Sequence, residues 1–390
     1  MPTAVLDVDL SALPPALSGL GRYERALVLV RWRGRPVGQV TLPVTDGAIA
    51  GDALRDAALA AAGDLISECR LREYLGVSDA PAALPPATVA VCTRDRPAEL
   101  ARCLDALLAA PDDDREIVVV DSASRDDATR RVAEGRPGVR YLREERPGLD
   151  RARNRALREA RHEIVAFTDD DTVPDPGWLR ALRGAFAEPR TLCVTGLTMP
   201  LELETEAQEW FERTNAFGRG FRRVVYDGAR DDPLRVARIG AGANMALRRS
   251  VLHLVGGFDA ALDAGTPTQS GGDHDMFSRI LAAGYCVVYE PAALSWHGHR
   301  REWEALRRAV RGYGTGVYAF LAKQLVERRE TGAPLVALAW LGAQLPALAR
   351  SALRRPGSAP LDIGLAELRG CLAGPRAWLA SRRAAARASE

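Results

Sequence analysis

The sequence predicts an α/β protein in which helices flank both faces of a mostly parallel sheet. A small α+β unit precedes this region, and helices follow it. From Thr88 onward, short apolar runs alternate with amphipathic helical segments. The runs are apolar throughout, which is typical of parallel strands that are buried on both faces. A Pro/Ala-rich stretch, SDAPAALPPA at 78–87, separates this pattern from a different one before it.

Residues 1–78 are predicted to form the first unit. Residues 25–44 alternate like a two-stranded hairpin that turns near Gly34 and Arg35, and residues 51–75 have helical spacing with Asp52 as the candidate N-cap. No residue pattern here indicates chemistry, so the unit is interpreted as a packing or partner-binding module. The predicted linker is 79–87, and the predicted catalytic domain is 88–301.

The elements of the catalytic domain follow in order along the chain. The expected strands are 88–93, 116–124, 139–144 and 163–168. The expected helices are 97–110, 125–135, 148–160 and one from about Pro176, the first of them opened by Pro97 at a first-turn position.

Composition and charge narrow the class of protein. With 47% hydrophobic and 27% charged residues the chain reads as globular, and a net charge of +2 gives no sign of nucleic-acid binding. The six cysteines are far apart with no CxxC pair, which favours reduced thiols in a cytoplasmic protein. The start, MPTAVLDVDL, contains Asp7 and Asp9 where a signal peptide would be basic and then apolar.

Polar side chains follow three of the predicted strands. Thr93 and Arg94 end the first strand, Asp121 ends the second, and Asp169 to Asp171 end the fourth. Ligands of parallel sheets collect at the carboxyl ends of the strands, so these side chains are expected at one rim. A GxGxxG dinucleotide motif is missing after the first strand, which argues against dinucleotide binding.

The adjacent carboxylates indicate a metal site. Carboxylates this close repel one another unless a cation lies among them, and oxygen ligands suit Mg²⁺ or Mn²⁺. Asp169 and Asp171 are therefore predicted to hold a divalent metal for a phosphate-bearing substrate. Arg94 and Arg153 are candidate diphosphate contacts, with an ordinary surface position as the alternative in so arginine-rich a chain.

Five segments in order resemble a family 2 glycosyltransferase with the GT-A fold, whose sheet is Rossmann-like, from about Thr88 to about Arg301. They are TVAVCTRDRP, EIVVVDSAS, PGLDRARNRAL, VAFTDDDTVPDPGWL and GGDHDMFSRILAAGY. The resemblance implies a nucleotide-sugar donor, most commonly UDP-linked, a metal on the Asp-x-Asp pair, and inversion at the anomeric carbon. The acceptor would be an unidentified hydroxyl on a glycan, a lipid carrier or a small molecule.

Site residues are carried over by position. The resemblance implies that Thr93 and Asp121 contact the base and ribose, that Asp170 belongs to the donor site, and that Gly242 and Asn244 lie near the donor sugar. One histidine of the pair His297 and His299 would complete the metal shell. Where the family usually reads Glu-Asp this chain has Gly272-Asp273, so Asp273 is the expected general base and Asp275 the second candidate. Capping of the following helix is the structural alternative for both acids.

Residues 302–390 are expected to be helical. The apolar stretch 333–349 is short for a membrane span and is interrupted by Gln344 and Pro346. The arginines after it are compatible with peripheral contact with the inner face of a membrane. Packing on the catalytic domain or a homodimer contact are the alternatives.

Two other functions fit part of the sequence. A non-catalytic sugar-nucleotide or glycan-binding module is favoured by Gly272 in place of Glu. A haloacid-dehalogenase-type phosphatase would use Asp169 as nucleophile after an apolar strand, but that chemistry normally needs a nearby lysine, and Lys323 is the only lysine in the chain.

Overall fold

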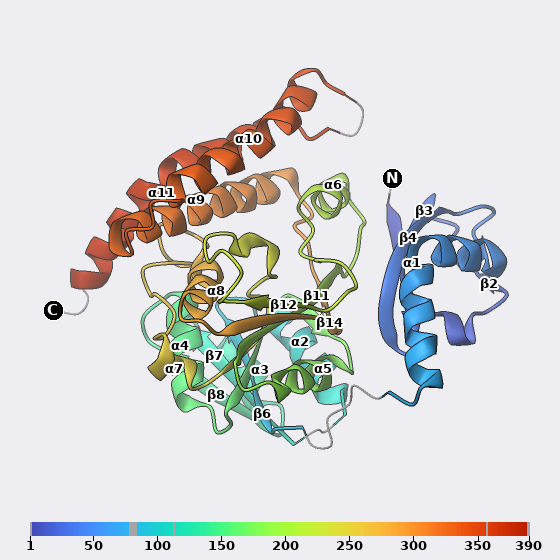
Figure 1. Ribbon diagram of the computed structural model, residues 1–390, viewed down its shortest axis with the longest axis horizontal. Coiled ribbons are helices and arrows are strands. Elements are labelled where there is room, and N and C mark those ends of the chain that lie inside the picture. The colour runs from blue at the N-terminus through green and yellow to red at the C-terminus, as the bar shows by residue number, and fades with distance from the viewer. Residues whose placement is uncertain (1, 78–83, 112–113, 356–357, 388–390) are drawn as a thin grey trace.

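The computed structural model describes residues 2–77, 84–111, 114–355 and 358–387. Figure 1 shows the small N-terminal unit in blue beside a central sheet with its helices, and the C-terminal helices in orange and red across one side. Most of the predicted linker lies outside the described residues. Residues 84–86 have no regular structure, and the first central strand begins at Ala87.

The N-terminal unit is a three-stranded sheet with one long helix against it. Its strand order is β1 (Thr3–Asp9), β3 (Arg25–Trp32), β4 (Arg35–Pro43), and the connections contain η1 (Leu10–Ala12), β2 (Ala16–Leu17) and β5 (Ile49–Ala50). The hairpin turns at Arg33 and Gly34, which both have positive φ as a two-residue hairpin turn requires. The helix α1 (Gly51–Tyr74) has Ala50 as N-cap, so the predicted cap, Asp52, is wrong and lies in the first turn.

The N-terminal unit contacts the central region through an arginine. Arg31 on β3 pairs with Asp7 at 2.7 Å and with Asp175, which follows a central strand, at 2.6 Å. The backbone N–H of Thr3 also donates to the carbonyl of Leu203. These polar contacts attach the unit to the segment after β10 and to the backbone at Leu203.

The central sheet has nine strands, and its first four in sequence run parallel. Strand order is β10-β14-β11-β13-β9-β6-β7-β8, with β12 paired to β14, and β13 is antiparallel to both of its neighbours. The strands are β6 (Ala87–Thr93), β7 (Arg115–Ser122), β8 (Val139–Glu144), β9 (Ile164–Asp169), β10 (Thr172–Pro174), β11 (Thr191–Pro200), β12 (Val224–Asp227), β13 (Asn244–Arg248) and β14 (Cys286–His297). The predicted α/β class with a mostly parallel sheet is confirmed.

Both faces of this sheet are buried, as the apolar runs predict. Along β6, Ala90 and Cys92 belong to one apolar cluster, whereas Val89 and Val91 belong to another on the opposite face. The helices α4 (Leu149–Glu159) and α8 (Gly272–Ala282) cover the first face. The helices α2 (Pro97–Ala109), α3 (Ala128–Glu134) and α5 (Trp178–Gly184) cover the second.

The remaining helices include the long ones at the C-terminus. They are η2 (Ala185–Ala187), α6 (Glu206–Asn215), η3 (Val236–Arg238), α7 (Val251–Leu254), α9 (Trp303–Glu327), α10 (Ala333–Ala352) and α11 (Leu361–Arg387). Figure 1 shows α9, α10 and α11 side by side above the sheet. The helix α10 runs unbroken through Gln344 and Pro346, so these residues interrupt the apolar stretch without ending the helix.

Candidate active site

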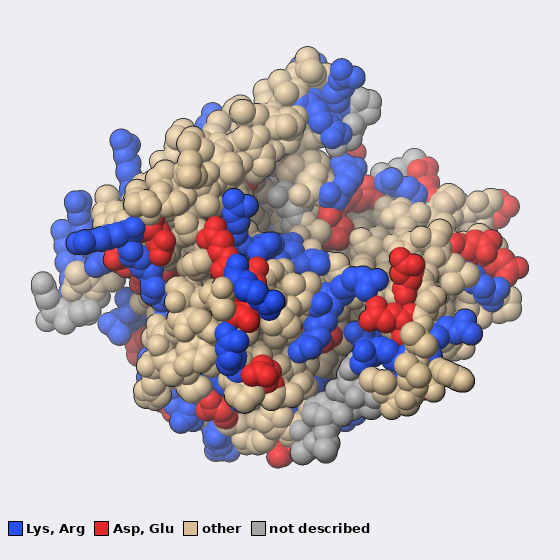
Figure 2. All heavy atoms as spheres, in the orientation of Figure 1, with Lys and Arg blue, Asp and Glu red and all other residues tan. Residues whose placement is uncertain are grey.

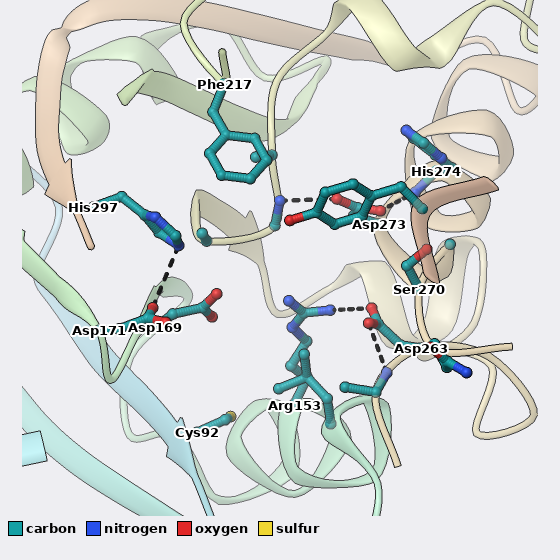
Figure 3. A pocket seen from close by; sticks show the side chains of 18 of the residues that line it. Cys92, Arg153, Asp169, Asp171, Phe217, Asp263, Ser270, Asp273, His274 and His297 are labelled. Carbon is teal, nitrogen blue, oxygen red and sulfur yellow. Dashed lines mark hydrogen bonds and ion pairs between the residues drawn. The ribbon is translucent and has the colours of Figure 1, made fainter. Parts of the chain in front are cut away.

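A cavity of about 490 Å³ lies at the carboxyl edge of the parallel strands. The register explains why: Thr93 on β6 is opposite Asp121 on β7, and Cys92 is opposite Asp169 on β9, so these strands end level. Segments far apart in the chain line the cavity, including 92–96, 169–171, 240–243, 269–274, His297 and residues of α9, α10 and α11. Figure 3 shows this pocket from close by.

Two aspartates and a histidine form a compact group on one wall of the cavity. Ligand atoms of Asp169, Asp171 and His297 all lie within 4.8 Å of one another. The antiparallel pairing of β10 with β14 places Thr172 opposite His297 and so brings this imidazole to Asp171, with 3.4 Å between Nε2 and Oδ1 (Figure 3). The Asp-x-Asp spacing predicted two of these three ligands.

The charges of this group suit a divalent cation. Burial raises the pKa of Asp169 to about 7, and Asp171 and Asp170 add to the effect while Arg153 opposes it. Burial also lowers the pKa of His297 to about 4, which keeps the imidazole neutral and able to coordinate. Two carboxylate oxygens and a neutral imidazole are a donor set that Mn²⁺ or Mg²⁺ accepts, and a cation would relieve the repulsion between the carboxylates.

Asp171 is held ionised by arginines that the sequence analysis missed. Burial opposes its ionisation, but the charges of Arg96 and Arg300 act against this and favour a pKa of its carboxyl below the usual value. Arg96 lies 3.0 Å and Arg300 3.4 Å from Asp171. The sequence offered one signal for Arg96, which is that it lies two residues after Arg94 and close to the end of β6.

Asp170, the middle acid, turns away from the metal group. Its carboxylate accepts from the hydroxyl of Thr93 at 2.7 Å and from Arg96 at 2.5 Å. Burial raises its pKa to about 6, against the effect of Arg96. Thr93 and Asp170 both line the cavity, but the bond between them joins β6 to β9.

Asp121 is not on the cavity wall. It is fully buried, and its carboxylate accepts from the backbone N–H of Ser124 at 2.8 Å, the hydroxyl of Tyr141 at 2.8 Å, and Arg143 at 3.3 Å. These bonds fix the turn after β7. The neighbouring Ser122 lines the cavity instead, so the predicted contact between Asp121 and the nucleotide is not supported.

The two arginines predicted for the diphosphate lie in different settings. Arg94 lines the cavity with its side chain 41% exposed, so its guanidinium is open to a ligand. Arg153 also lines the cavity but is buried, 2.8 Å from Asp263 and 3.1 Å from Asp150 (Figure 3). Asp263 was not predicted, and it holds Arg153 beneath the site.

Asp273 faces the cavity from the first turn of α8. Its carboxylate accepts the backbone N–H of Gly242 at 2.9 Å and of His274 at 2.8 Å. Burial would raise its pKa, but His274, Arg153 and these two N–H groups lower it below the usual value. A side chain at Gly242 would place its Cβ 2.7 Å from the Arg153 guanidinium, so this close approach needs glycine.

The missing glutamate before Asp273 has a physical explanation. A Cβ at position 272 would lie 2.0 Å from the Asp150 carboxylate, which comes from α4 and is buried. Burial raises the pKa of Asp150 well above its usual value, and its Oδ2 has no hydrogen-bond partner. A carboxyl from another helix therefore occupies the space that a side chain at Gly272 would need.

Asp275, the second candidate base, does not line the cavity. It is fully buried, with one carboxylate oxygen 2.8 Å from Arg279 and the other 2.8 Å from Lys323 on α9. The same lysine pairs with Asp259 at 2.7 Å. This position supports a structural role that ties α8 to α9, and it leaves Asp273 as the candidate base.

Asp275→Asn is therefore expected to lower the free energy of unfolding by about 3 kcal/mol or more, because it leaves two buried cations short of a partner. Turnover per folded molecule should stay within a few-fold. Chemical denaturation measures the first effect, with Asp127→Asn on the exposed start of α3 as the control. An unchanged stability together with a collapse of turnover would show that Asp275, and not Asp273, is the general base.

Asn244 and His299 also lie behind the cavity wall. The amide of Asn244 is buried, donates to the carbonyls of Leu197 and Ala293, and accepts from the Trp178 indole, and its place near the donor sugar stays a prediction. His299 contacts the Glu212 carboxylate at 2.9 Å and the His297 ring at 3.4 Å. Such outer partners orient a metal-binding imidazole. We therefore expect His297 to be the metal ligand and His299 to be its outer partner.

The fold and this site are similar to those of glycosyltransferases of GT-A type. Known proteins agree with that class. Residues 88–256 match the family model described as "Glycosyl transferase family 2". The match covers less than half of the chain and lies within the predicted catalytic domain.

Similar proteins cover the chain to different extents. The "Pre-mycofactocin glycosyltransferase" of Mycobacterium tuberculosis is 33% identical over 189 residues, which is 47% of this chain and 36% of that protein. The chain thus spans about a third of this relative's length. The "Probable glycosyltransferase YdaM" of Bacillus subtilis is 23% identical over 62% of this chain and 58% of that protein.

A solved structure shares the fold. The "Mannosyltransferase PcManGT from Pyrobaculum calidifontis in complex with GDP-Man and Mn2+" matches 83% of this chain and 97% of its own, with 22% identity and a TM-score of 0.53. The match therefore extends beyond the residues of the family model.

Proposed function

We propose that this protein is an inverting, metal-dependent glycosyltransferase that moves a sugar from a nucleoside-diphosphate sugar to an acceptor hydroxyl. One observation carries the proposal. The group Asp169, Asp171 and His297 and the ionised Asp273 lie on the wall of the same cavity. The mannosyltransferase with the same fold was solved with GDP-Man and Mn²⁺, which supports this donor class.

The roles follow from the charges. Asp169, Asp171 and His297 would hold Mn²⁺ or Mg²⁺, which supplies positive charge for the diphosphate. Arg94 and Arg300 line the same region and add to it. Asp273 accepts the proton of the acceptor hydroxyl while that oxygen bonds to the anomeric carbon, and the electron pair of the breaking bond leaves with the diphosphate. One displacement of this kind inverts the configuration.

The proposal covers donors whose nucleotide base is uracil or guanine. UDP-linked donors are the first choice because they are the commonest in families of this kind, but the residue that would favour uracil, Asp121, is occupied by Tyr141 and Arg143. Release of nucleoside diphosphate from UDP- and GDP-sugars in the presence of Mn²⁺ tests the proposal, and product NMR gives the anomeric configuration. Retention of configuration would exclude the single displacement.

The two alternative functions lose their main support. Gly272 argued for a non-catalytic module, but the Asp150 carboxyl fills that place and Asp273 is ionised and faces the cavity. A phosphatase needs a lysine near Asp169, but Lys323 is bound to Asp259 and Asp275 and does not line the cavity.

We also propose that α10 rests on the cytoplasmic face of a membrane. It is the one helix among the described residues that is long and apolar enough to span a membrane, and only 6% of its apolar window is buried. Leu335, Leu338 and Leu345 lie on one side of it, each at least 63% exposed. Figure 2 shows a wide uncharged surface along α10 and α11, with basic residues near the end of α10.

Three basic residues give this surface a preference for anionic lipid. Arg350, Arg354 and Arg355 follow the exposed leucines and are themselves exposed. An apolar face beside basic residues is the pattern of a helix lying in the interface. A second copy of the chain is the other occupant of this face, and the predicted homodimer would then form in solution.

Replacing Leu335, Leu338 and Leu345 together by Gln is expected to lower binding to anionic vesicles at least about tenfold, since each buried leucine contributes about 1.5–3 kcal/mol. Flotation with phosphatidylserine vesicles measures this, and Leu59→Gln on α1 is a control with an exposed leucine elsewhere. Equal flotation of variant and parent would reject membrane contact. A parent that sediments as a dimer, with a monomeric variant, would assign the face to a second copy.

A further inference from the structure

The cavity continues beyond the proposed catalytic groups into the C-terminal helices. Val310, Tyr313 and Val317 on α9, Trp340 on α10 and Glu367 on α11 line this end. All five lie outside residues 88–256, the part of the chain that matches the family model. The C-terminal helices thus build a wall of the cavity that lies outside the family model.

The two ends of the cavity differ in charge. On the side of the central domain, where the donor diphosphate would bind, it is lined by arginines at 94, 96, 153, 219 and 300 and by aspartates at 169, 170, 171, 263 and 273. The described lining from α9, α10 and α11 has no basic residue and one acid, Glu367. A cationic group of the acceptor would therefore meet a carboxylate and no competing basic residue at this end.

Glu367 is a buried carboxyl with no cation. It is 7% exposed, and its Oε1 accepts from the side-chain amide of Gln344 at 2.8 Å. No ion pair reaches it from the described part of the chain, and burial raises its pKa to about 7, with the Trp340 indole opposing. The indole Nε1 of Trp340 is itself buried without a well-aligned hydrogen-bond partner. A carboxyl without a cation and an indole N–H without a well-aligned partner thus lie side by side in an otherwise apolar part of the cavity.

We propose, on the basis of the proposed function, that Glu367 binds a protonated amine of the acceptor. The apolar body between this amine and the reacting hydroxyl would pack against Tyr313, Val317 and Trp340. An ammonium group supplies the missing charge partner of the carboxylate, and apolar walls suit the chain or ring that joins the two polar ends. The acceptor class is therefore an amphiphilic amino alcohol or amino phenol.

The alternative is that Glu367 only joins α11 to α10 through Gln344. Substitution separates the two roles because Glu367→Gln keeps an oxygen to accept from Gln344 and removes the charge. If Glu367 serves recognition, this variant should be at least as thermally stable as the parent at pH 8, since a buried carboxylate without a cation opposes folding. It should also lose selectivity for the amine.

Binding of two matched probes, 8-aminooctan-1-ol and octan-1-ol, tests this in the full chain by calorimetry without nucleotide or metal. We expect the amine to bind at least about tenfold tighter in the parent, and this preference to vanish in Glu367→Gln but persist in Glu134→Gln on exposed α3. Equal binding of the probes to the parent, a preference that survives Glu367→Gln, or a less stable variant that binds neither probe would overturn the proposal. Because nucleotide and metal are left out, failure here is distinct from failure of the donor site.

Discussion

Asp273→Asn is expected to lower sugar transfer by about 10²-fold or more and to leave Mn²⁺-dependent donor binding within a few-fold. The acceptor hydroxyl has a pKa far above 7, so its proton must pass to a base as the new bond forms. Asp273 is suited to this because its lowered pKa keeps it ionised at neutral pH, and the N–H groups of Gly242 and His274 fix its orientation.

Transfer rate and donor affinity, measured side by side, distinguish this role from a structural one. Asp127→Asn is the surface control, and Asp275→Asn reports the effect of losing a buried carboxylate outside the cavity. Near-normal turnover in Asp273→Asn would show that another group takes the proton. A large loss of donor binding in the same variant would show that Asp273 contributes to the donor site.

Asp171→Asn is expected to weaken Mn²⁺-dependent binding of nucleoside diphosphate by at least about tenfold, since even outer partners of a metal site commonly contribute that much. The substitution keeps the shape of the side chain but removes one negative charge from the group that it forms with Asp169 and His297. The positive charges of Arg96 and Arg300 would then be balanced by one carboxylate fewer. Binding of nucleoside diphosphate without metal should therefore weaken less.

Calorimetric titration of the nucleoside diphosphate with and without Mn²⁺ measures this effect. Asp170→Asn is the closest control in the chain, because its carboxylate is bound by Thr93 and Arg96 and lies outside the metal group. An Asp171→Asn protein with unchanged, metal-dependent affinity would contradict the assignment of the ligands.

Local sequence patterns were sufficient to predict the elements that build the cavity. Apolar runs alternating with helices gave β6, β7, β8 and β9, and the acids after β9 indicated the metal group. These features depend on residues close together in the chain. For the same reason Pro97 marked the start of α2 correctly.

Local patterns could not show where a side chain is bound by a residue far away in the sequence. Asn244 is held by Trp178 and by the carbonyls of Leu197 and Ala293, and Asp275 is held by Lys323. Neither partner could be inferred from spacing. The same holds for Gly272, whose space is filled by the Asp150 carboxyl from α4.

The contribution of the C-terminal helices to the cavity was also beyond the sequence pattern. The apolar residues of α10 predicted a surface helix, but not that Trp340 lines the same cavity as Asp273. That outcome depends on how α10 and α11 pack on α9. The predicted domain limits at 78, 87 and 301 remain predictions.

The central claim is that this cavity binds a nucleotide sugar through a divalent metal. Thermal unfolding of the purified full chain with UDP- and GDP-sugars, with and without Mn²⁺, tests it most directly. A donor at about 100 times its dissociation constant should add about 2.7 kcal/mol of stability, and we expect this gain only when Mn²⁺ is present and only with a native Asp169, Asp171 and His297 group. An equal gain in EDTA, or the same metal-dependent gain in Asp171→Asn, would contradict the account.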